Sequence, residues 1–448
     1  MRIVIAGAGD IGFHLARLLV SENQDIVLID LNKDVLDYAE SHLDVSTIHG
    51  DASSPSILEN ADISQSELFL AVTTEEHSNI VSCILAKQMG AKRTIARVVN
   101  EEYLDERYKQ KFKILGIDKL ISPIRLAVSE ISRLLEQCEV TDIFEFEKGR
   151  LSLAGISLDD DSDIKDKTIE KVMSMDDKVA FNPIAILRGN KTIIPRKYTR
   201  LRRNDHLYFL TEGDQLTQLL ERTGKTHIKV RNIMILGGSA LSIATVKMLE
   251  DKYNITIIEQ DKEKSKKLTE ELNNALIIHG DTGNFELLKE EGIENMDVFL
   301  ALTENSETNI LTSLMADELG VYKTIALVDN TYYTRISQNI GVDTMINMKI
   351  IAANNIFRFI RKGTVEAITS LHGVDAEVIE YVINKESKIT KKPLKKLHFP
   401  NAMVVGAVIR DDKVIIPDGD TVFMLGDKII VLALPRAIQK LERFFADD

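Results

Sequence analysis

The chain has 448 residues, of which 44% are hydrophobic and 28% are charged, and its formal net charge is −13. This composition is typical of a globular protein of roughly two to four domains, and its acidity disfavours binding to nucleic acid or to anionic lipid. We expect no membrane-spanning helix, because no apolar run approaches ~18 residues. We also expect no signal peptide. The two cysteines predict neither a disulfide framework nor a zinc site.

In chain order, apolar strands first alternate with helical patterns. The expected strands are Ile3–Ala6, Ile26–Ile29, Val45–Ile48, Leu68–Val72, Thr94–Val98 and Lys119–Ile121. Between them apolar residues recur at helical spacing, as they do over Ile80–Met89. This alternation predicts an α/β fold with a doubly wound parallel sheet of the Rossmann type.

A different pattern follows Pro123. An amphipathic helix is expected over Ile124–Gln137, and after it come short strands such as Ile184–Leu187 and Leu207–Leu210, separated by turns. The polar stretch Glu221–Arg231 is interpreted as a linker. These features predict a small α+β domain that a crossing helix joins to the parallel sheet.

The whole arrangement then occurs a second time. Ile48–Asp51 and Ile278–Asp281 both read Ile-His-Gly-Asp, and a helix resembling the first crossing helix is expected over Ile350–Arg361. Later strands, Val404–Ile409 and Ile429–Leu432, repeat those of the small domain. The expected domains are 1–123 and 231–349 for the Rossmann-like sheets, 124–139 and 350–367 for the crossing helices, and 140–224 and 368–448 for the small domains.

A glycine-rich loop joins the first strand to the first helix. It is the G-x-G-x-x-G sequence made by Gly7, Ala8, Gly9, Asp10, Ile11 and Gly12. In such a loop the first glycine allows a tight turn, the second lets the backbone approach a pyrophosphate at the helix N-terminus, and the third permits close packing of helix on strand. We interpret it as a dinucleotide-binding loop, with a purely structural turn as the alternative.

Two charged residues lie where neighbouring strands end. Asp30 ends the second strand, where its carboxylate could accept both ribose hydroxyls, which favours an unphosphorylated ribose over NADP. Arg97 ends the fifth strand and could reach the phosphates from the opposite side of the crevice.

Four smaller residues are further candidates at the same edge. Thr73 and Thr74 end the fourth strand, and the alternative for both is an ordinary strand-to-helix turn. Asp51 and Ala52 could form the adenine wall, although Asp51 could equally cap the next helix, since the repeat has Asp281 in its place.

The second copy departs from this pattern at the loop and at the cation. Its corresponding residues are Gly237, Gly238, Ser239, Ala240, Leu241 and Glu259. Ser239 and Ser242 replace the second and third glycines, Glu259 keeps the carboxylate, and Leu327 stands in place of Arg97. Because a Cβ at position 239 hinders the approach of a pyrophosphate to the backbone, we predict a second site that is weaker, altered in ligand or vacant.

No catalytic set accompanies these loops. The repeat partners His49 and His279 lie beside apolar strands, which favours core or capping roles, and no nucleophile elbow, zinc-protease helix or Walker A loop is present. The acidic run Asp159–Asp163 lacks the spacing of a calcium loop and is interpreted as a solvated turn. We therefore expect neither an enzyme nor a metal site.

The order of these motifs, and its duplication, resembles the TrkA family, the peripheral subunits of Trk-type potassium uptake systems built from two RCK (regulator of potassium conductance) units. The resemblance covers essentially the whole chain. It implies NAD(H), or ATP and ADP, as ligands held by the loop residues, Asp30, Thr73, Thr74 and Arg97. It also implies a cytoplasmic homo-oligomer, a dimer or tetramer, bound to a TrkH-like potassium-translocating membrane subunit without inserting into lipid. The alternatives are an NAD-dependent oxidoreductase and a soluble nucleotide-binding scaffold.

Overall fold

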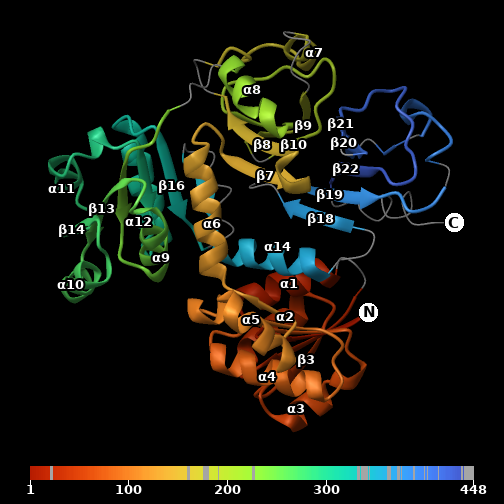
Figure 1. Ribbon diagram of the computed structural model, residues 1–448, viewed down its shortest axis with the longest axis vertical. Helices are drawn as coiled ribbons and strands as arrows, with labels where there is room; N and C mark the ends of the chain where they lie inside the picture. Colours follow the sequence, from red (N-terminus) through yellow and green to blue (C-terminus); the bar gives the residue numbers. More distant parts are fainter. Residues whose placement is uncertain are drawn as a thin grey trace. The chain divides into compact units, whose positions relative to one another are not determined.

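A computed structural model describes most of the chain and shows two kinds of sheet, each present twice (Figure 1). The described residues are 1–20, 24–158, 162–174, 181–189, 191–223, 228–329, 333, 342, 344–360, 365–370, 374, 376–386, 389–397, 399–400, 402–411, 413–434 and 437. Most of the acidic run that begins at Asp159 lies outside them.

The first sheet has six parallel strands in the order β3-β2-β1-β4-β5-β6. Its strands are β1 Arg2–Ala6, β2 Asp25–Asp30, β3 Ser46–His49, β4 Leu68–Ala71, β5 Thr94–Arg97 and β6 Lys119–Ile121. Its helices are α1 Asp10–Val20, α2 Lys33–His42, α3 Pro55–Asn60, α4 Glu76–Gln88 and α5 Glu106–Ile114. The strand order is that of a Rossmann sheet, in which the order of the strands reverses at the switch point between β1 and β4. The predicted fold class is therefore confirmed.

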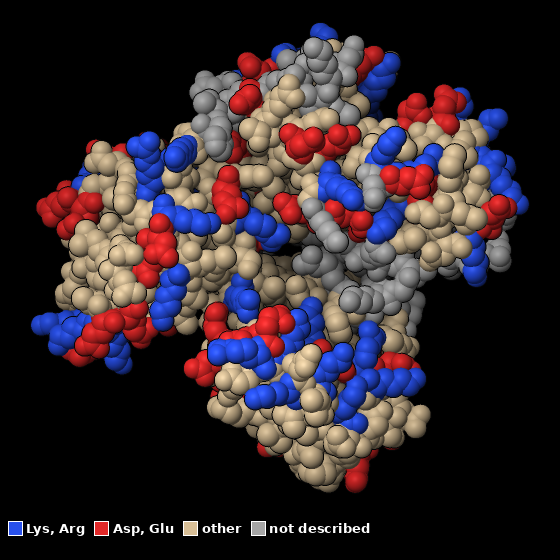
Figure 2. Space-filling model, viewed as in Figure 1, with Lys and Arg blue, Asp and Glu red and all other residues tan. Residues whose placement is uncertain are grey.

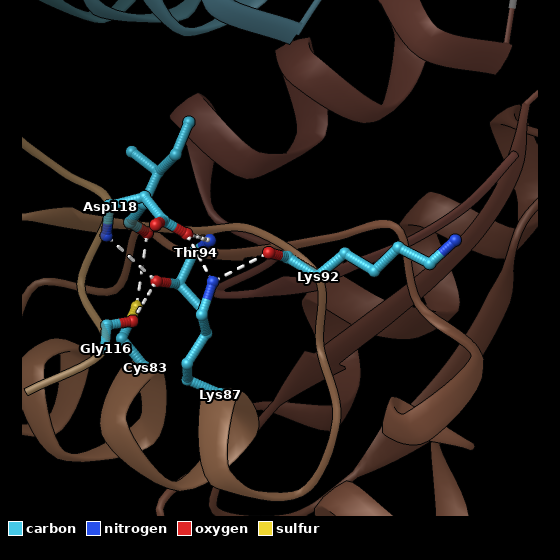
Figure 3. Close-up of polar contacts among 7 residues, drawn as sticks. Cys83, Lys87, Lys92, Thr94, Gly116 and Asp118 are labelled. Atoms are coloured by element: carbon cyan, nitrogen blue, oxygen red, sulfur yellow. Dashed lines mark hydrogen bonds and ion pairs between the residues drawn. The ribbon is translucent and has the colours of Figure 1, made fainter. Parts of the chain in front are cut away.

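The strands form where the sequence is continuously apolar, because a parallel sheet covered by helices is buried on both faces. β1 and β4 are almost entirely inaccessible to solvent. One face packs under α3 and α4, while α1 lies on the other face (Figure 1). Figure 3 shows polar contacts that hold the amino ends of β5 and β6. There Asp118 accepts a hydrogen bond from the Thr94 N–H at 2.8 Å and forms an ion pair with Lys87 at 2.9 Å.

The first small domain follows the crossing helix α6, Pro123–Glu136. Its antiparallel sheet has the order β10-β9-β11-β8-β7. The strands are β7 Asp142–Phe146, β8 Leu151–Ser157, β9 Phe181–Arg188, β10 Lys191–Ile193 and β11 Asp205–Glu212, and the helices are α7 Ile169–Met173 and α8 Leu216–Arg222.

The second half repeats both sheets with the same strand order. Its parallel sheet is β14-β13-β12-β15-β16-β17, and its antiparallel sheet is β18-β19-β22-β20-β21. The parallel strands are β12 Asn232–Leu236, β13 Asn254–Glu259, β14 Ala275–His279, β15 Val298–Ala301, β16 Lys323–Leu327 and β17 Thr344–Ile346. Their helices are α9 Ala240–Leu249, α10 Lys262–Glu271, α11 Phe285–Glu290 and α12 Ser306–Glu318. The crossing helix is α14 Met348–Ile360, and the small-domain strands are β18 Val365–Ser370, β19 Glu377–Val382, β20 Met403–Arg410, β21 Lys413–Ile415 and β22 Lys428–Ala433.

The chain divides into two compact units that do not coincide with the two halves of the sequence. The first unit is 1–127 with 347–360, so α14 of the second half packs on α1 of the first. The second unit is 128–346 with 361–448 and holds the other parallel sheet and both small domains. The apolar residues of the crossing helices, including Ile131 and Ile356, are buried within the single chain.

The two small domains share one core inside the second unit. Apolar residues of both antiparallel sheets form a single buried cluster, with Leu153 and Leu210 from the first and Val378 and Ile430 from the second. The Asn182 side chain adds a hydrogen bond of 2.8 Å to the carbonyl oxygen of Gly406. The duplication therefore lets one small domain cover the apolar face of the other.

A buried ion pair is built identically into each small domain. The Arg188 Nε donates to Asp205 Oδ1 and its Nη2 to Asp205 Oδ2, both at 2.7 Å. Arg410 holds Asp427 in the same way at 2.8 and 2.7 Å. Both carboxylates have no solvent exposure. Such bidentate pairing satisfies a buried carboxylate that would otherwise be strongly destabilising.

No described helix is both long and apolar enough to span a membrane. On the face shown in Figure 2, acidic and basic side chains are interspersed over the described residues. That face therefore has no extended basic area of the kind that nucleic-acid binding requires.

Candidate nucleotide-binding sites

The tight turn after β1 depends on two of the three loop glycines. Gly7 has φ +101, and a Cβ there would lie 2.8 Å from the backbone nitrogen of Thr73. A Cβ on Gly12 would lie 1.8 Å from the carbonyl oxygen of Gly7 and 3.6 Å from the Ile5 side chain. The third glycine thus makes room for the carbonyl of the first more than for the strand itself.

Gly9 has a different environment, because a Cβ there would meet no atom within 4 Å. It lies directly before α1, and its carbonyl accepts the N–H of Phe13 at 2.8 Å. The N–H groups of Ile11 and Gly12 in the first turn have no acceptor among the described residues. Unpaired N–H groups at a helix N-terminus attract anions, so this open position suits a phosphate.

Asp30 is held at the mouth of the same loop. Its Oδ2 accepts the N–H of Ala8 at 2.6 Å, and its Oδ1 accepts the N–H of Asn32 at 2.8 Å. The carboxylate is half-buried and keeps lone pairs beyond these two bonds, since a carboxylate offers about four acceptor positions. The Asp30 carboxylate therefore holds the loop in place and keeps acceptor positions of the kind that a ribose hydroxyl needs.

Arg97 lies at the end of β5, half-buried. Its Nη1 is 3.4 Å from the carbonyl oxygen of Thr73, and its Nε is buried without a hydrogen-bond partner among the described residues. Burial lowers the pKa of Arg97, but a guanidinium stays charged at neutral pH. A half-buried cation with an unsatisfied donor is well suited to an anionic ligand.

The Thr73 side chain is engaged in the turn after β4. Its hydroxyl donates to Asn79 Oδ1 at 2.7 Å, and the Asn79 amide donates to the carbonyl oxygens of Thr73 and Arg97, each at 3.0 Å. Thr303 and Asn309 repeat this arrangement in the second half. Asn79 therefore ties the ends of β4 and β5 together, a role that its repeat partner Asn309 could have suggested. Thr74 is exposed beside this turn.

Asp51 makes local contacts with the turn that enters α3. Its Oδ1 accepts both the N–H and the hydroxyl of Ser53 at 2.8 Å, and Asp281 accepts the N–H of Gly283 at 2.9 Å in the repeat. The neighbouring Ala52 is buried in the core beneath the sheet.

The repeated histidines His49 and His279 are exposed, so they lie outside the core. Each contacts the loop that follows Asp30 or Glu259. His49 Nε2 is 2.9 Å from the carbonyl oxygen of Leu31, and His279 Nε2 is 3.1 Å from that of Gln260.

The second loop is closed by its own side chain. Ser239 precedes α9, and its hydroxyl oxygen accepts the N–H of Ser242 at 3.2 Å. This bond occupies the position that is open next to Gly9 in the first half. Glu259 is only 5% exposed, and its Oε2 accepts the N–H of Gly238. A Cβ at Gly238 would lie 3.0 Å from that oxygen. Glu259 is longer than Asp30, and the residue next to it is a glycine where the first half has Ala8.

A first prediction concerns Asp30, the carboxylate proposed to bind the ribose. Asp30→Ala is expected to weaken nucleotide binding by about 1.5–3 kcal/mol, the range for hydrogen bonds to charged groups. Isothermal titration of the folded variant measures the loss. Glu259→Ala in the second loop is the matched control and should change the affinity little, because that carboxylate is already buried against its own loop. Equal losses in the two variants would contradict the assignment.

A second prediction concerns the cation. Arg97→Ala should lower nucleotide affinity by about 1.5–3 kcal/mol through the loss of a charged donor. Its counterpart Leu327 is buried, so Leu327→Met, which conserves volume, is a better control than alanine. The control should bind nucleotide like the unmodified chain. Loss of affinity in both variants, or in neither, would show that Arg97 does not face the ligand.

Comparison with known proteins relates the chain to one family over its whole length. The TrkA-N domain matches residues 3–123 and 233–348, and the TrkA-C domain matches residues 153–224 and 378–446. The Trk system potassium uptake protein TrkA homolog 2 of Methanosarcina mazei is 31% identical over 99% of this chain and 100% of its own length. The TrkA homolog of Archaeoglobus fulgidus is 32% identical, again over 99% of this chain and 100% of that protein.

Among solved structures, the GsuK channel bound to NAD has a TM-score of 0.60 and 16% identity, covering 99% of this chain and 79% of that one. The crystal structure of the GsuK RCK domain matches equally, with a TM-score of 0.60, 16% identity and 95% of that chain covered. At this identity the similarity shows a common fold.

Proposed function

This chain belongs to the TrkA family of potassium uptake proteins, and on that premise we propose that it is a cytoplasmic regulatory subunit that gates a Trk-type transporter in response to nucleotide. The ligand enters the first loop, and NAD(H) or the pair ATP and ADP is the class that the loop suits. The observation that supports this most is the open helix N-terminus at Gly9, in a loop whose Ala8 N–H is bound by the Asp30 carboxylate. The Arg97 guanidinium contacts the carbonyl oxygen of Thr73, the residue against which Gly7 of the same loop packs.

The ligand class follows from chemistry at three points. The unpaired N–H groups of α1 and the guanidinium of Arg97 suit phosphates, and the carboxylate of Asp30 suits a ribose with two free hydroxyls. The GsuK channel, which shares the fold, has been solved with NAD. Thr73, Thr74, Asp51 and Ala52 are proposed as backbone or van der Waals contacts.

Titration with NAD⁺, NADH, ADP and ATP tests the proposal, together with mass spectrometry of any nucleotide that co-purifies. Binding of at least one ligand at micromolar concentration is expected, and binding of none would refute the proposal. Turnover of NADH with a panel of carbonyl substrates separates the regulatory role from an oxidoreductase, which would consume the cofactor.

We further propose that the subunit works as a dimer or tetramer beneath a potassium-translocating membrane protein. A chain that gates a transporter must remain bound to it, so co-purification with that membrane subunit is expected. Recovery of the chain only as a free monomer, by light scattering at micromolar concentration, would favour a soluble scaffold.

A further inference from the structure

The first turn of α1 carries an acid that the second half of the chain neutralises. Asp10 is exposed, with 72% of its side chain accessible, and its Oδ2 forms an ion pair with Lys349 Nζ at 2.6 Å. Lys349 is in the first turn of α14, which packs on α1 within the first unit. A lysine from 339 residues along the chain thus lies beside the phosphate loop.

This ion pair has no equivalent in the repeat. The residue that corresponds to Asp10 is Ala240, at the start of α9, and the residue that corresponds to Lys349 is Ile124, at the start of α6. The same kind of crossing helix therefore forms with an apolar residue at this position. The ion pair of Asp10 and Lys349 is thus present beside the open loop of the first half. It is absent from the second half, where Ser239 closes the loop.

The position of Asp10 conflicts with the ligand proposed for this site. Its carboxylate belongs to the residue directly before Ile11 and Gly12, whose N–H groups have no acceptor among the described residues. A carboxylate at this position is favourable for the empty helix, but it repels an incoming phosphate at close range. The repulsion grows with the number of phosphate charges unless a cation offsets it.

We propose that Lys349 is a specificity-determining positioning residue of the first nucleotide site, which acts by neutralising Asp10 so that a highly charged nucleotide can bind there. The inference rests on the proposed function of this loop. It makes the second half of the chain a part of the first site, because Lys349 belongs to α14, which packs on α1.

The same helix offers a path for regulation. Further along α14, Asn355 Oδ1 accepts a hydrogen bond from Lys119 Nζ at 3.1 Å, and that ammonium lies 4.9 Å from the centre of the Phe359 ring. Beyond Ile360 the chain leads to β18 of the second small domain. A ligand that changes the ion pair between Asp10 and Lys349 therefore acts on α14, the helix that connects the first site to the second small domain. Such differential contact is what a ligand needs in order to shift a conformational equilibrium.

The test compares dissociation constants of NADH, ADP and ATP for the full chain and for four variants: Lys349→Met, Lys349→Arg, Asp10→Asn, and Lys349→Met combined with Asp10→Asn. Lys349→Met should weaken ATP binding about tenfold or more and NADH binding less, since an unmasked carboxylate repels the more highly charged ligand more. Lys349→Arg should stay within about threefold of the unmodified chain, since it keeps the charge. The combined variant should regain most of the lost affinity, because the repelling carboxylate is gone.

Salt titration supplies a readout that a structural role would not change. For any nucleotide that binds, the affinity of Lys349→Met should rise with ionic strength relative to the unmodified chain, because salt screens the exposed Asp10. Lys247→Met, which removes an exposed ion pair with Glu271 in the second half, is the matched control and should change nothing.

The same measurements distinguish a failure of the proposed function from a failure of the inference about Lys349. If the unmodified chain binds no nucleotide, the proposed function fails. If it binds nucleotide but Lys349→Met weakens all ligands equally, leaves them unchanged, or is not rescued in the combined variant, the inference about Lys349 is wrong while the proposed function stands. Thermal unfolding of each variant shows whether the fold is kept.

Discussion

Gly9→Val is expected to abolish nucleotide binding at the first site while the chain stays folded. A Cβ at this position has no atom within 4 Å, so the added side chain starts in open space. It would occupy the place that we propose for a phosphate, next to the N–H groups of Ile11 and Gly12. Losing two hydrogen bonds to a charged group removes about 3–6 kcal/mol, a factor of about a hundred or more in affinity.

Calorimetric titration measures this loss of affinity, and three further variants serve as comparisons. Gly9→Ser should also bind poorly, because serine can cap the helix as Ser239 does, and its thermal stability should be unchanged or slightly higher. Gly12→Val should unfold the loop, since its Cβ overlaps the carbonyl oxygen of Gly7. Ser239→Val in the second half should leave the tighter binding event intact. Full affinity in a folded Gly9→Val variant would exclude this loop as the phosphate site.

Asp205→Ala is expected to produce the largest loss of stability. The substitution leaves the Arg188 guanidinium without its bidentate partner and also frees the N–H of Arg202, which Asp205 accepts at 2.8 Å. Breaking a buried pair by removing one partner costs about 3–5 kcal/mol. The lower end applies, because 27% of the Arg188 side chain is exposed and water can solvate part of the charge.

Denaturant unfolding of the full chain measures the change, and the duplication supplies the control. Asp427→Ala removes the equivalent partner of Arg410 and should have a similar effect. Asp205→Asn keeps the shape and one acceptor and should lose less. Because both small domains share one core, either alanine variant should destabilise both. A loss below about 1 kcal/mol, the usual value of an exposed pair, would contradict a buried structural role.

The fold class could be predicted because its determinants are local in the sequence. Strands buried on both faces appear as continuous apolar runs, of which β1 and β4 are examples. The glycine loop and Asp30 at the end of the next strand identify the first candidate site. The repeated motifs then extend the prediction to the second half, and the same strand orders in the two halves agree with it.

The contacts that distinguish the two sites could not be predicted, because they depend on side-chain geometry or on distant residues. Sequence comparison showed that Ser239 replaces a glycine, but not that its hydroxyl closes the helix N-terminus. Glu259 has one methylene more than Asp30, and Gly238 leaves room beside its buried carboxylate. The pairing of Asp10 with Lys349 requires knowing that α14 packs on α1. No local pattern contains that information.

We expect nucleotide bound at the first loop to control potassium transport by a membrane partner. Potassium flux into vesicles that contain the Trk-type membrane subunit, with the purified chain added, tests it most directly. With the unmodified chain, flux should change on addition of the nucleotide that binds in titration, and with Gly9→Val, still bound to the vesicles, flux should no longer respond. An identical response with both proteins, or flux that does not respond to nucleotide with the unmodified chain, would show that the first loop does not control transport.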